Sequence, residues 1–172
     1  KHVPIALITK WFAGMTLLSC IRWLNSRFVI KKESYKNNPR RSLAVFLFLT
    51  LCMGMAWGSC YFIFFNYIHG TDERSIILLV LGGMSAGAIA SLSIYLPAYF
   101  LYVLPMFLPI ITYNFYLGQS DASILATMIS LFVLMLLVTA KINSQLLKKS
   151  LKLTKEKVNL IRKLEQTNEK LE

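Results

Sequence analysis

Apolar residues occur along this chain in five continuous blocks of about 20 residues each, separated by short polar segments. A helix of that length crosses roughly 30 Å of hydrocarbon, whereas the strands of a membrane barrel would show short alternating segments. The pattern therefore predicts an all-α fold, a polytopic bundle of transmembrane helices. The expected spans are residues 3–24, 42–67, 75–96, 98–117 and 122–140.

The polar segments differ in charge, and the difference predicts an orientation. Segment 25–41 holds six basic residues and one acid, and the tail 141–172 holds nine basic and four acidic residues. Because short cytoplasmic segments are rich in Lys and Arg, both are expected in the cytoplasm. The connections His69–Arg74 and Gly118–Asp121 contain at most one basic residue and are expected outside.

Small residues recur every four positions in the third block, and a GxxxG pair lies in the second. On a helix this spacing makes a flat face that another helix can approach closely in a bilayer. We expect the pair in the second block to pack against Gly83 and Gly87. The residues expected at such packing faces are Gly54, Gly58, Gly82, Gly83, Ala86, Gly87, Ala90 and Ser91.

Three prolines shape the fourth block. Pro97 suits the first turn of a helix, where its missing N–H is not needed. Pro105 and Pro109 fall inside that helix, and each removes one backbone hydrogen bond. We therefore expect Pro105 and Pro109 to kink the fourth span.

Composition agrees with a membrane protein: 56% of the residues are hydrophobic and the mean hydropathy is +0.55. The net charge of +11 could indicate nucleic-acid binding. However, the charges lie in two clusters beside predicted spans, and no nucleic-acid motif accompanies them. The expected partner is membrane lipid rather than nucleic acid.

The sequence offers little chemistry. Its cysteines, Cys20, Cys52 and Cys60, lie in apolar blocks without metal-ligand spacing, so neither a metal site nor a cofactor is predicted. Lys10 lies within the first span and either extends to the membrane surface or faces the bundle interior. The acids ahead of the tail all lie outside the predicted spans, so neither an enzyme nor a proton relay is expected: Glu33, Asp72, Glu73 and Asp121.

Aromatic residues gather on the second, third and fourth spans. Tyr and Trp combine an apolar body with one polar group, which suits the binding of a small apolar ligand. We predict a pocket between the fourth span and the second and third. Alternatively, the same residues serve in packing and in the interfacial aromatic belt. The predicted lining residues are Trp57, Cys60, Tyr61, Tyr95, Tyr99 and Tyr102.

The tail 141–172 has no Gly or Pro, and its apolar residues follow a four-three rhythm that later shifts by one position. This pattern predicts a short parallel coiled coil with a stutter, and therefore a homodimer. The alternative is a single amphipathic helix lying on the bilayer. We expect two domains, a bundle over 1–140 and a signalling helix over 141–172. The seam positions are Leu147, Leu151, Val158 and Ile161, with Thr154 in the series, and then Leu160, Leu164 and Leu171.

Two runs carry a resemblance to a known group of proteins. They are LGGMSAGAIASLSIYLPAYFLYVLPMFLP, from Leu81 to Pro109, and SLKLTKEKVNLIRKLEQTNEKLE, from Ser150. Together they resemble the multi-span sensor region of bacterial GGDEF proteins (diguanylate cyclases, often with an EAL domain) and of hybrid sensor histidine kinases. The resemblance implies about six spans in a bacterial inner membrane. If the intact protein begins in the cytoplasm, the sixth span precedes Lys1. The resemblance also implies a dimeric signalling helix that feeds an output domain.

These observations predict the sensory input and dimerisation module of a receptor that responds to the membrane itself or to a small apolar ligand. A small transporter or channel is the alternative, and a purely structural membrane anchor is a third possibility. A transporter would need a polar path at mid-depth. The candidates for such a path are Ser85, Ser91, Ser93, Thr112, Asn114 and Thr127.

Overall fold

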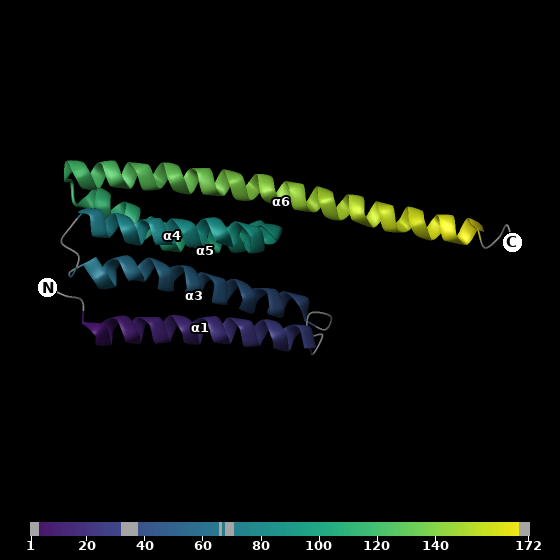
Figure 1. Cartoon of the computed structure of the whole chain (residues 1–172), viewed down its shortest axis with the longest axis horizontal. Coiled ribbons are helices and arrows are strands. Elements are labelled where there is room, and N and C mark those ends of the chain that lie inside the picture. The colour runs from purple at the N-terminus through teal and green to yellow at the C-terminus, as the bar shows by residue number, and fades with distance from the viewer. Residues whose placement is uncertain (1–3, 32–37, 66, 68–70, 169–172) are drawn as a thin grey trace.

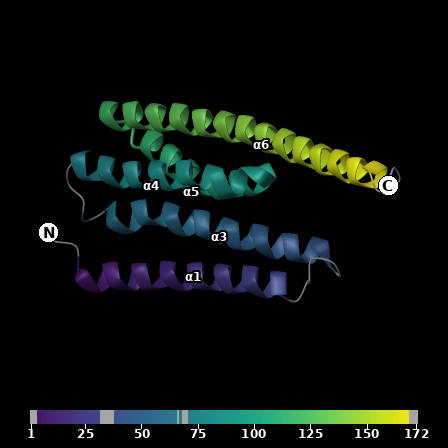
Figure 2. The same ribbon diagram turned by 45° about the vertical axis from the view of Figure 1, so that its right-hand side comes forward.

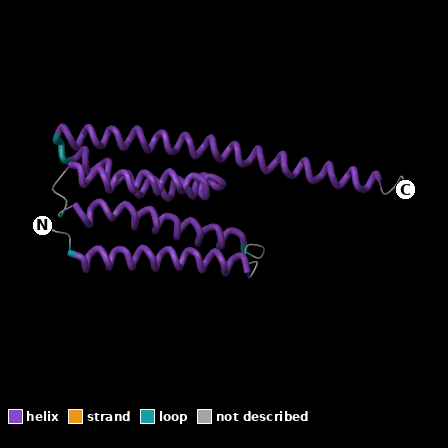
Figure 3. Tube along the Cα trace, in the orientation of Figure 1, coloured by secondary structure: helices purple, strands orange, loops and turns teal. Residues whose placement is uncertain are grey.

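The computed structural model describes residues 4–31, 38–65, 67 and 71–168. Within these residues every regular element is a helix (Figure 3), which confirms the all-α fold. The elements are α1 (Ile5–Lys31), α3 (Pro39–Phe65), α4 (Thr71–Leu92), the 3₁₀ helix η1 (Ser93–Tyr95), α5 (Leu96–Tyr116) and α6 (Ser120–Asn168).

The helices lie side by side, and each runs opposite to the one before it (Figures 1 and 2). α5 is the central helix of this bundle, because one of its faces is buried from Ala98 to Asn114. It packs between α3 on one side and α4 and α6 on the other. α6 is the longest helix, and its second half extends well past the bundle (Figure 1).

Four stretches of helix are long and apolar enough to cross a membrane: Ile5–Lys31, Pro39–Phe64, Arg74–Tyr116 and Ser120–Gln166. The third of them reverses direction at η1 and so comprises both α4 and α5. These two helices have 22 and 21 residues, about 32 Å each at 1.5 Å per residue, which is close to the hydrocarbon thickness. The expected count of five crossings stays a prediction.

The helices next to the basic segment are longer than the predicted spans. α1 continues to Lys31, and α3 already begins at Pro39, a position where a missing N–H is tolerated. Polar residues set the ends of the predicted spans, but Arg and Lys are good helix formers, so they do not end the helices.

The reversal at η1 has a local cause. Pro97 lies in the first turn of α5, as predicted, and it has no N–H to donate to the carbonyl of Ser93. Tyr95 has an extended backbone, with φ −120° and ψ 90°, which separates the two helices. Asn143 of α6 donates a hydrogen bond of 2.8 Å from its Nδ2 to Oγ of Ser93. The turn is therefore tied to α6.

The closest helix contact joins α3 and α5. A Cβ atom on Gly58 would lie 2.8 Å from the carbonyl oxygen of Met106, and one on Gly54 would overlap the carbonyl of Tyr102. The predicted pairing of this GxxxG motif with Gly83 and Gly87 is wrong, because those two glycines have no neighbouring atom within 4 Å of a Cβ position. Glycines on one helix are enough for two helices to approach closely, and here the glycines of α3 allow α5 to approach.

The two internal prolines, Pro105 and Pro109, lie within α5, which is continuous from Leu96 to Tyr116. A Cβ atom on Gly58 would also lie 3.1 Å from the carbonyl oxygen of Pro105, which loses its helical donor because Pro109 has no N–H. A kink at these prolines stays a prediction.

Candidate ligand groove and signalling helix

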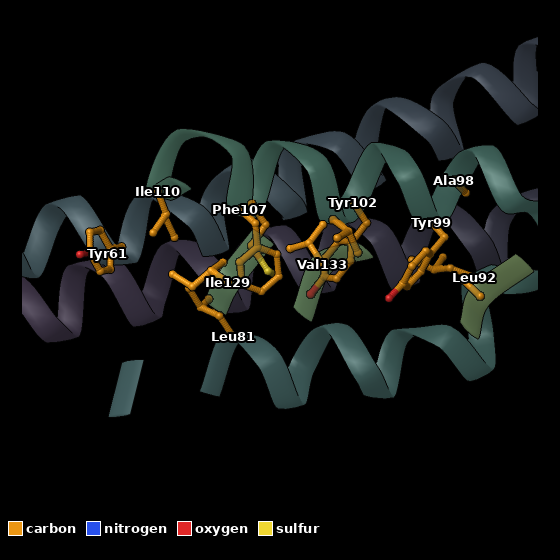
Figure 4. Close-up of a cluster of buried hydrophobic side chains, with 13 residues drawn as sticks. Tyr61, Leu81, Leu92, Ala98, Tyr99, Tyr102, Phe107, Ile110, Ile129 and Val133 are labelled. Atoms are coloured by element: carbon orange, nitrogen blue, oxygen red, sulfur yellow. The ribbon is translucent and has the colours of Figure 1, made fainter. Parts of the chain in front are cut away.

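Three of the six predicted ligand residues are packed in the core. Tyr61, Tyr99 and Tyr102 are at most 3% exposed. Figure 4 shows them spread along the bundle, with Tyr61 near one end and Tyr99 near the other. They therefore do not surround a single cavity.

The phenolic groups at the two ends have hydrogen-bond partners. Tyr61 donates to Oδ1 of Asn114 at 3.2 Å, and Asn114 donates from Nδ2 to the carbonyl of Ile110 at 2.8 Å. Tyr99 donates to the carbonyl of Ser85 at 3.2 Å. These bonds link α5 to α3 and to α4, and they satisfy polar groups that burial would otherwise destabilise.

The other three predicted residues lie elsewhere. Trp57 is half-buried and makes an edge-on contact with Trp11 of α1, with 5.4 Å between ring centroids. Cys60 is half-buried and Tyr95 is exposed at the reversal. A ligand role for the six residues stays a prediction, but the structure does not bring them together.

The small residues of α4 divide into two groups. Gly82 is buried, and a Cβ atom on it would lie 3.3 Å from the ring of Phe132 in α6. The remaining small residues leave a broad exposed face on this helix: Gly83, Ala86, Gly87, Ala90 and Ser91.

A groove of about 640 Å³ runs between α4 and α6, above Phe107 of α5. Phe107 and Phe132 meet edge to face at its base, with 6.2 Å between ring centroids. That volume lies in the range of small-molecule binding sites. All but one of its lining residues are apolar or glycine: Ser75, Leu78, Leu79, Gly82, Gly83, Ala86, Phe107, Leu125, Met128, Ile129 and Phe132.

One end of this groove is polar. A second pocket, of about 220 Å³, shares Ser75, Leu125 and Met128 with the groove and therefore adjoins it. It lies where α4 begins, α5 ends and α6 begins. Its additional polar lining residues are Arg74, Asn114, Gln119 and Asp121.

Sequence reasoning did not find this groove, although Gly82, Gly83 and Ala86 were predicted as packing residues. Small side chains on one helix leave a groove wherever the opposite helix does not fill the space. Met128 and Phe132, large side chains one turn apart on α6, could have indicated a helix face that lines such a groove. What the sequence lacks is the information that α6 faces α4.

α6 forms one wall of the groove and also leaves the bundle. From Ala122 to Ala140 its buried positions follow a four-three spacing that keeps one stripe against the other helices. Leu147 is half-buried, and every residue from 148 to 166 is exposed. The buried positions are Ala122, Ala126, Ile129, Val133, Leu136, Ala140 and Ser144.

The predicted coiled-coil seam lies on the part of α6 that extends beyond the bundle. Leu151, Val158, Ile161 and Leu164 are all exposed in the single chain. Leu171 lies outside the described residues. Pairing along this seam stays a prediction.

The polar residues considered for a transport path all have hydrogen-bond partners within the protein: Asn114 bonds with Tyr61 and Ile110, and Ser93 accepts from Asn143. The hydroxyls of Ser85, Ser91, Thr112 and Thr127 donate to carbonyls of their own helices. Lys10 is exposed on the outer side of α1 rather than facing the bundle. The described residues contain no group of three or more His, Cys, Asp or Glu side chains that could hold a metal ion.

Comparison with known proteins gives one match. No curated protein and no solved structure matches the chain. A family model described as a membrane-associated sensor, MASE5, matches residues 2–167. This match agrees with the helices that are long and apolar enough to cross a membrane, and it confirms the predicted membrane sensor region. Because it covers almost the whole sequence, the chain belongs to the MASE5 family of membrane-associated sensors.

Proposed function

We propose that this sensor is the input and dimerisation module of a bacterial receptor, and that α6 passes its signal to a C-terminal output domain. A diguanylate cyclase or a histidine kinase is the output that the sequence resemblance favours. The observation that carries this proposal is the continuity of α6, 49 residues or about 74 Å in one helix. α6 begins beside the groove and ends far outside the bundle (Figure 1).

A helix of this kind transmits rotation or tilt because nothing interrupts it. Residues 120–168 contain neither Gly nor Pro, the usual causes of a kink. The helix is held at the bundle by Asn143, and its free half starts after Leu147. A change in packing at Met128 or Phe132 therefore reaches the tail as a movement of a rigid rod.

The stripe of α6 that faces its neighbours also changes phase near Ala140, shortly before the helix leaves the bundle. Ala126, Val133, Ala140 and Leu147 form a column that continues as Thr154 and Ile161. Within the bundle its partner residues lie three positions after Ala126 and Val133, at Ile129 and Leu136, but four positions after Ala140, at Ser144. In the tail they lie four positions after, at Leu151 and Val158. At 100° per residue the stripe turns by about 50°.

This difference in phase suits a two-state relay. A parallel dimer pairs along the tail stripe, while the bundle holds the adjacent stripe of the same helix. A small rotation at the groove then favours one of two nearly equivalent seams, the second being Leu160 and Leu164.

The distribution of charge supports an orientation with the tail in the cytoplasm. The end of α1, which carries Arg27 and Lys31, and the start of α3, which carries Arg40 and Arg41, lie at the end of the bundle from which α6 emerges (Figures 1 and 2). Two basic clusters on one side of a membrane mark the cytoplasmic side. We therefore place the module in the bacterial inner membrane, with five crossings, and with η1 on the cytoplasmic side.

The test is disulfide cross-linking along the tail of the full-length protein in native membranes. Cys20, Cys52 and Cys60 are first replaced, and single cysteines are then placed at each position from 145 to 168. We expect cross-linking maxima at Leu147, Leu151, Val158 and Ile161, in heptad register. A flat profile, with the apolar side protected by the membrane, would instead support an amphipathic helix and contradict the relay.

A further inference from the structure

We propose that the groove between α4 and α6 binds a single-chain amphiphile whose polar head carries no net charge, with the chain in the groove and the head in the adjoining polar pocket. This inference rests on the proposed function and names the ligand that the sensor would detect. Four observations carry it: the length of the groove, the chemistry of its polar end, the open space at Gly83 and the position of α6 in its wall.

The length of the groove matches one leaflet of a membrane. It extends along α4 from Ser75 to Ala86, twelve residues whose eleven steps of 1.5 Å give about 16 Å. The hydrocarbon core is about 30 Å thick, so this length is about half of it. The groove begins at the end of α4 that lies opposite the tail, which is the outer leaflet in the proposed orientation. A chain anchored there by its head reaches the middle of the bilayer.

The polar end matches a head group with both donors and acceptors. Arg74 and Asp121 bring one positive and one negative charge to the pocket, so the described residues of its lining carry no net charge. Gln119 adds an amide. Asn114 is 1% exposed and is held in place by its bonds with Tyr61 and Ile110, which makes that wall rigid. A zwitterionic head complements this set, whereas a lone carboxylate would pair with only half of it.

The glycines of α4 explain how an acyl chain fits into the groove. A Cβ atom on Gly82 would touch Phe132, so this glycine leaves room for that ring. A Cβ atom on Gly83 would meet no atom within 4 Å, although Gly83 lines the groove. The space in front of Gly83 is therefore open to an occupant. An acyl chain there contacts Ile129 and Phe132 directly, and so acts on α6.

The test is photolabelling of the full-length protein in nanodiscs of phosphatidylcholine and phosphatidylglycerol. The probe is lysophosphatidylcholine with a diazirine in the middle of its acyl chain. We expect labelled peptides from α4 and α6 around Gly83 and Phe132, and we expect unlabelled lysophosphatidylcholine to compete. Labelling spread over all lipid-facing helices, without competition, would overturn the proposal.

Two matched substitutions make the test specific. Gly83→Leu fills the groove and should lower labelling about tenfold, which corresponds to about 1.4 kcal/mol of binding free energy. Gly87→Leu adds the same side chain on the same helix, also where no atom lies within 4 Å, but outside the groove, and should leave labelling unchanged. If Gly83→Leu does not fold, Ala86→Leu fills the same groove. Equal labelling in a folded groove variant and in Gly87→Leu contradicts the proposal.

Competition with other lipids identifies the head and the number of chains. A fatty acid of equal chain length should compete at least several-fold more weakly, because it lacks the positive group. A diacyl phosphatidylcholine that competes as well as the lysolipid would make the groove a site for bulk lipid and would refute a single-chain ligand.

The outcomes separate this inference from the proposed function. If tail cross-linking shows heptad register but the groove takes no specific label, only the ligand assignment fails. If the groove is labelled but the tail shows no register, the relay fails and the binding site stands.

Discussion

At the scale of single residues, the bundle depends on a few positions where helices touch at backbone distance. Gly54 and Gly58 let α3 approach the carbonyls of Tyr102 and Met106 in α5. In a bilayer such close contact drives association, since lipid removes the hydrophobic difference between packed and separated helices. Gly83 and Gly87 show the same sequence spacing but have no such contact. Spacing alone therefore does not identify the packing glycine.

The first prediction is that Gly58→Ala destabilises the bundle. The new methyl group would lie 2.8 Å from the carbonyl oxygen of Met106, and backbone cannot move aside as a flexible side chain can. Overpacking of this kind costs about 1–3 kcal/mol. Thermal unfolding in detergent micelles should show a lower midpoint. Gly83→Ala is the control, and an equal loss in both variants would refute the contact.

The second prediction concerns the buried hydrogen bond between α3 and α5. Tyr61→Phe removes the hydroxyl that contacts Asn114 and should destabilise the bundle by about 0.6 kcal/mol, the average for such bonds between membrane helices. Denaturant titration of the purified protein measures the change. Tyr116→Phe, at a residue that is 88% exposed, should have no effect. A stability equal to that of the unchanged protein would mean that water or lipid replaces the bond without loss.

At the scale of elements, α6 belongs to both halves of the molecule, and its last hydrogen-bonded contact with the bundle is at η1. Asn143 donates to Ser93, while Ala140 and Ser144 are buried beside this contact. Immediately after Leu147 the helix is exposed. The turn that Pro97 creates is thus the place where the bundle holds the proposed signalling helix.

The third prediction is that loosening this contact changes the tail and leaves the fold intact. Asn143→Ala removes the bond to Ser93, worth about 0.6 kcal/mol between membrane helices, and so frees α6 to rotate. The tail cross-linking pattern should move from the Leu151 seam toward the Leu160 seam. Asn159→Ala, at an exposed position in the tail, is the control. Ser93→Ala should reproduce the shift, and an unchanged pattern in both variants would remove η1 from the relay.

How far the sequence predicts these features depends on whether their causes are local. Pro97 ends one helix and begins the next through its own missing N–H, so the reversal was predictable. The partner of Gly58 and the groove beside Phe132 were not predictable, because each depends on which helix lies opposite. α3 and α4 carry the same small-residue spacing, and only the three-dimensional order places α5 against Gly54 and Gly58 of the first and α6 against Gly82 of the second.

At the scale of the whole molecule, the chain joins a membrane bundle to a helix that projects from it on the side of the basic residues. The bundle fixes one face of α6, and the proposed dimer uses an adjacent face of the same helix. If the bundle controls the dimer through these two faces of α6, the angle between the faces determines the signal. The length of the connection is then less important than its phase.

The fourth prediction follows from that relation. One alanine inserted after Gln145 rotates the tail by about 100° relative to the bundle, and seven inserted residues rotate it by only about 20° net, because seven residues nearly complete two turns. The single insertion should displace the tail seam from the position set by the bundle and alter output in the full-length receptor. The seven-residue insertion should restore both. A helix that lies on the bilayer finds its own orientation and would tolerate either insertion equally. Equal output and equal cross-linking in the two variants would therefore favour that alternative, whereas a dependence on phase would show that the bundle and the tail act as one rigid element.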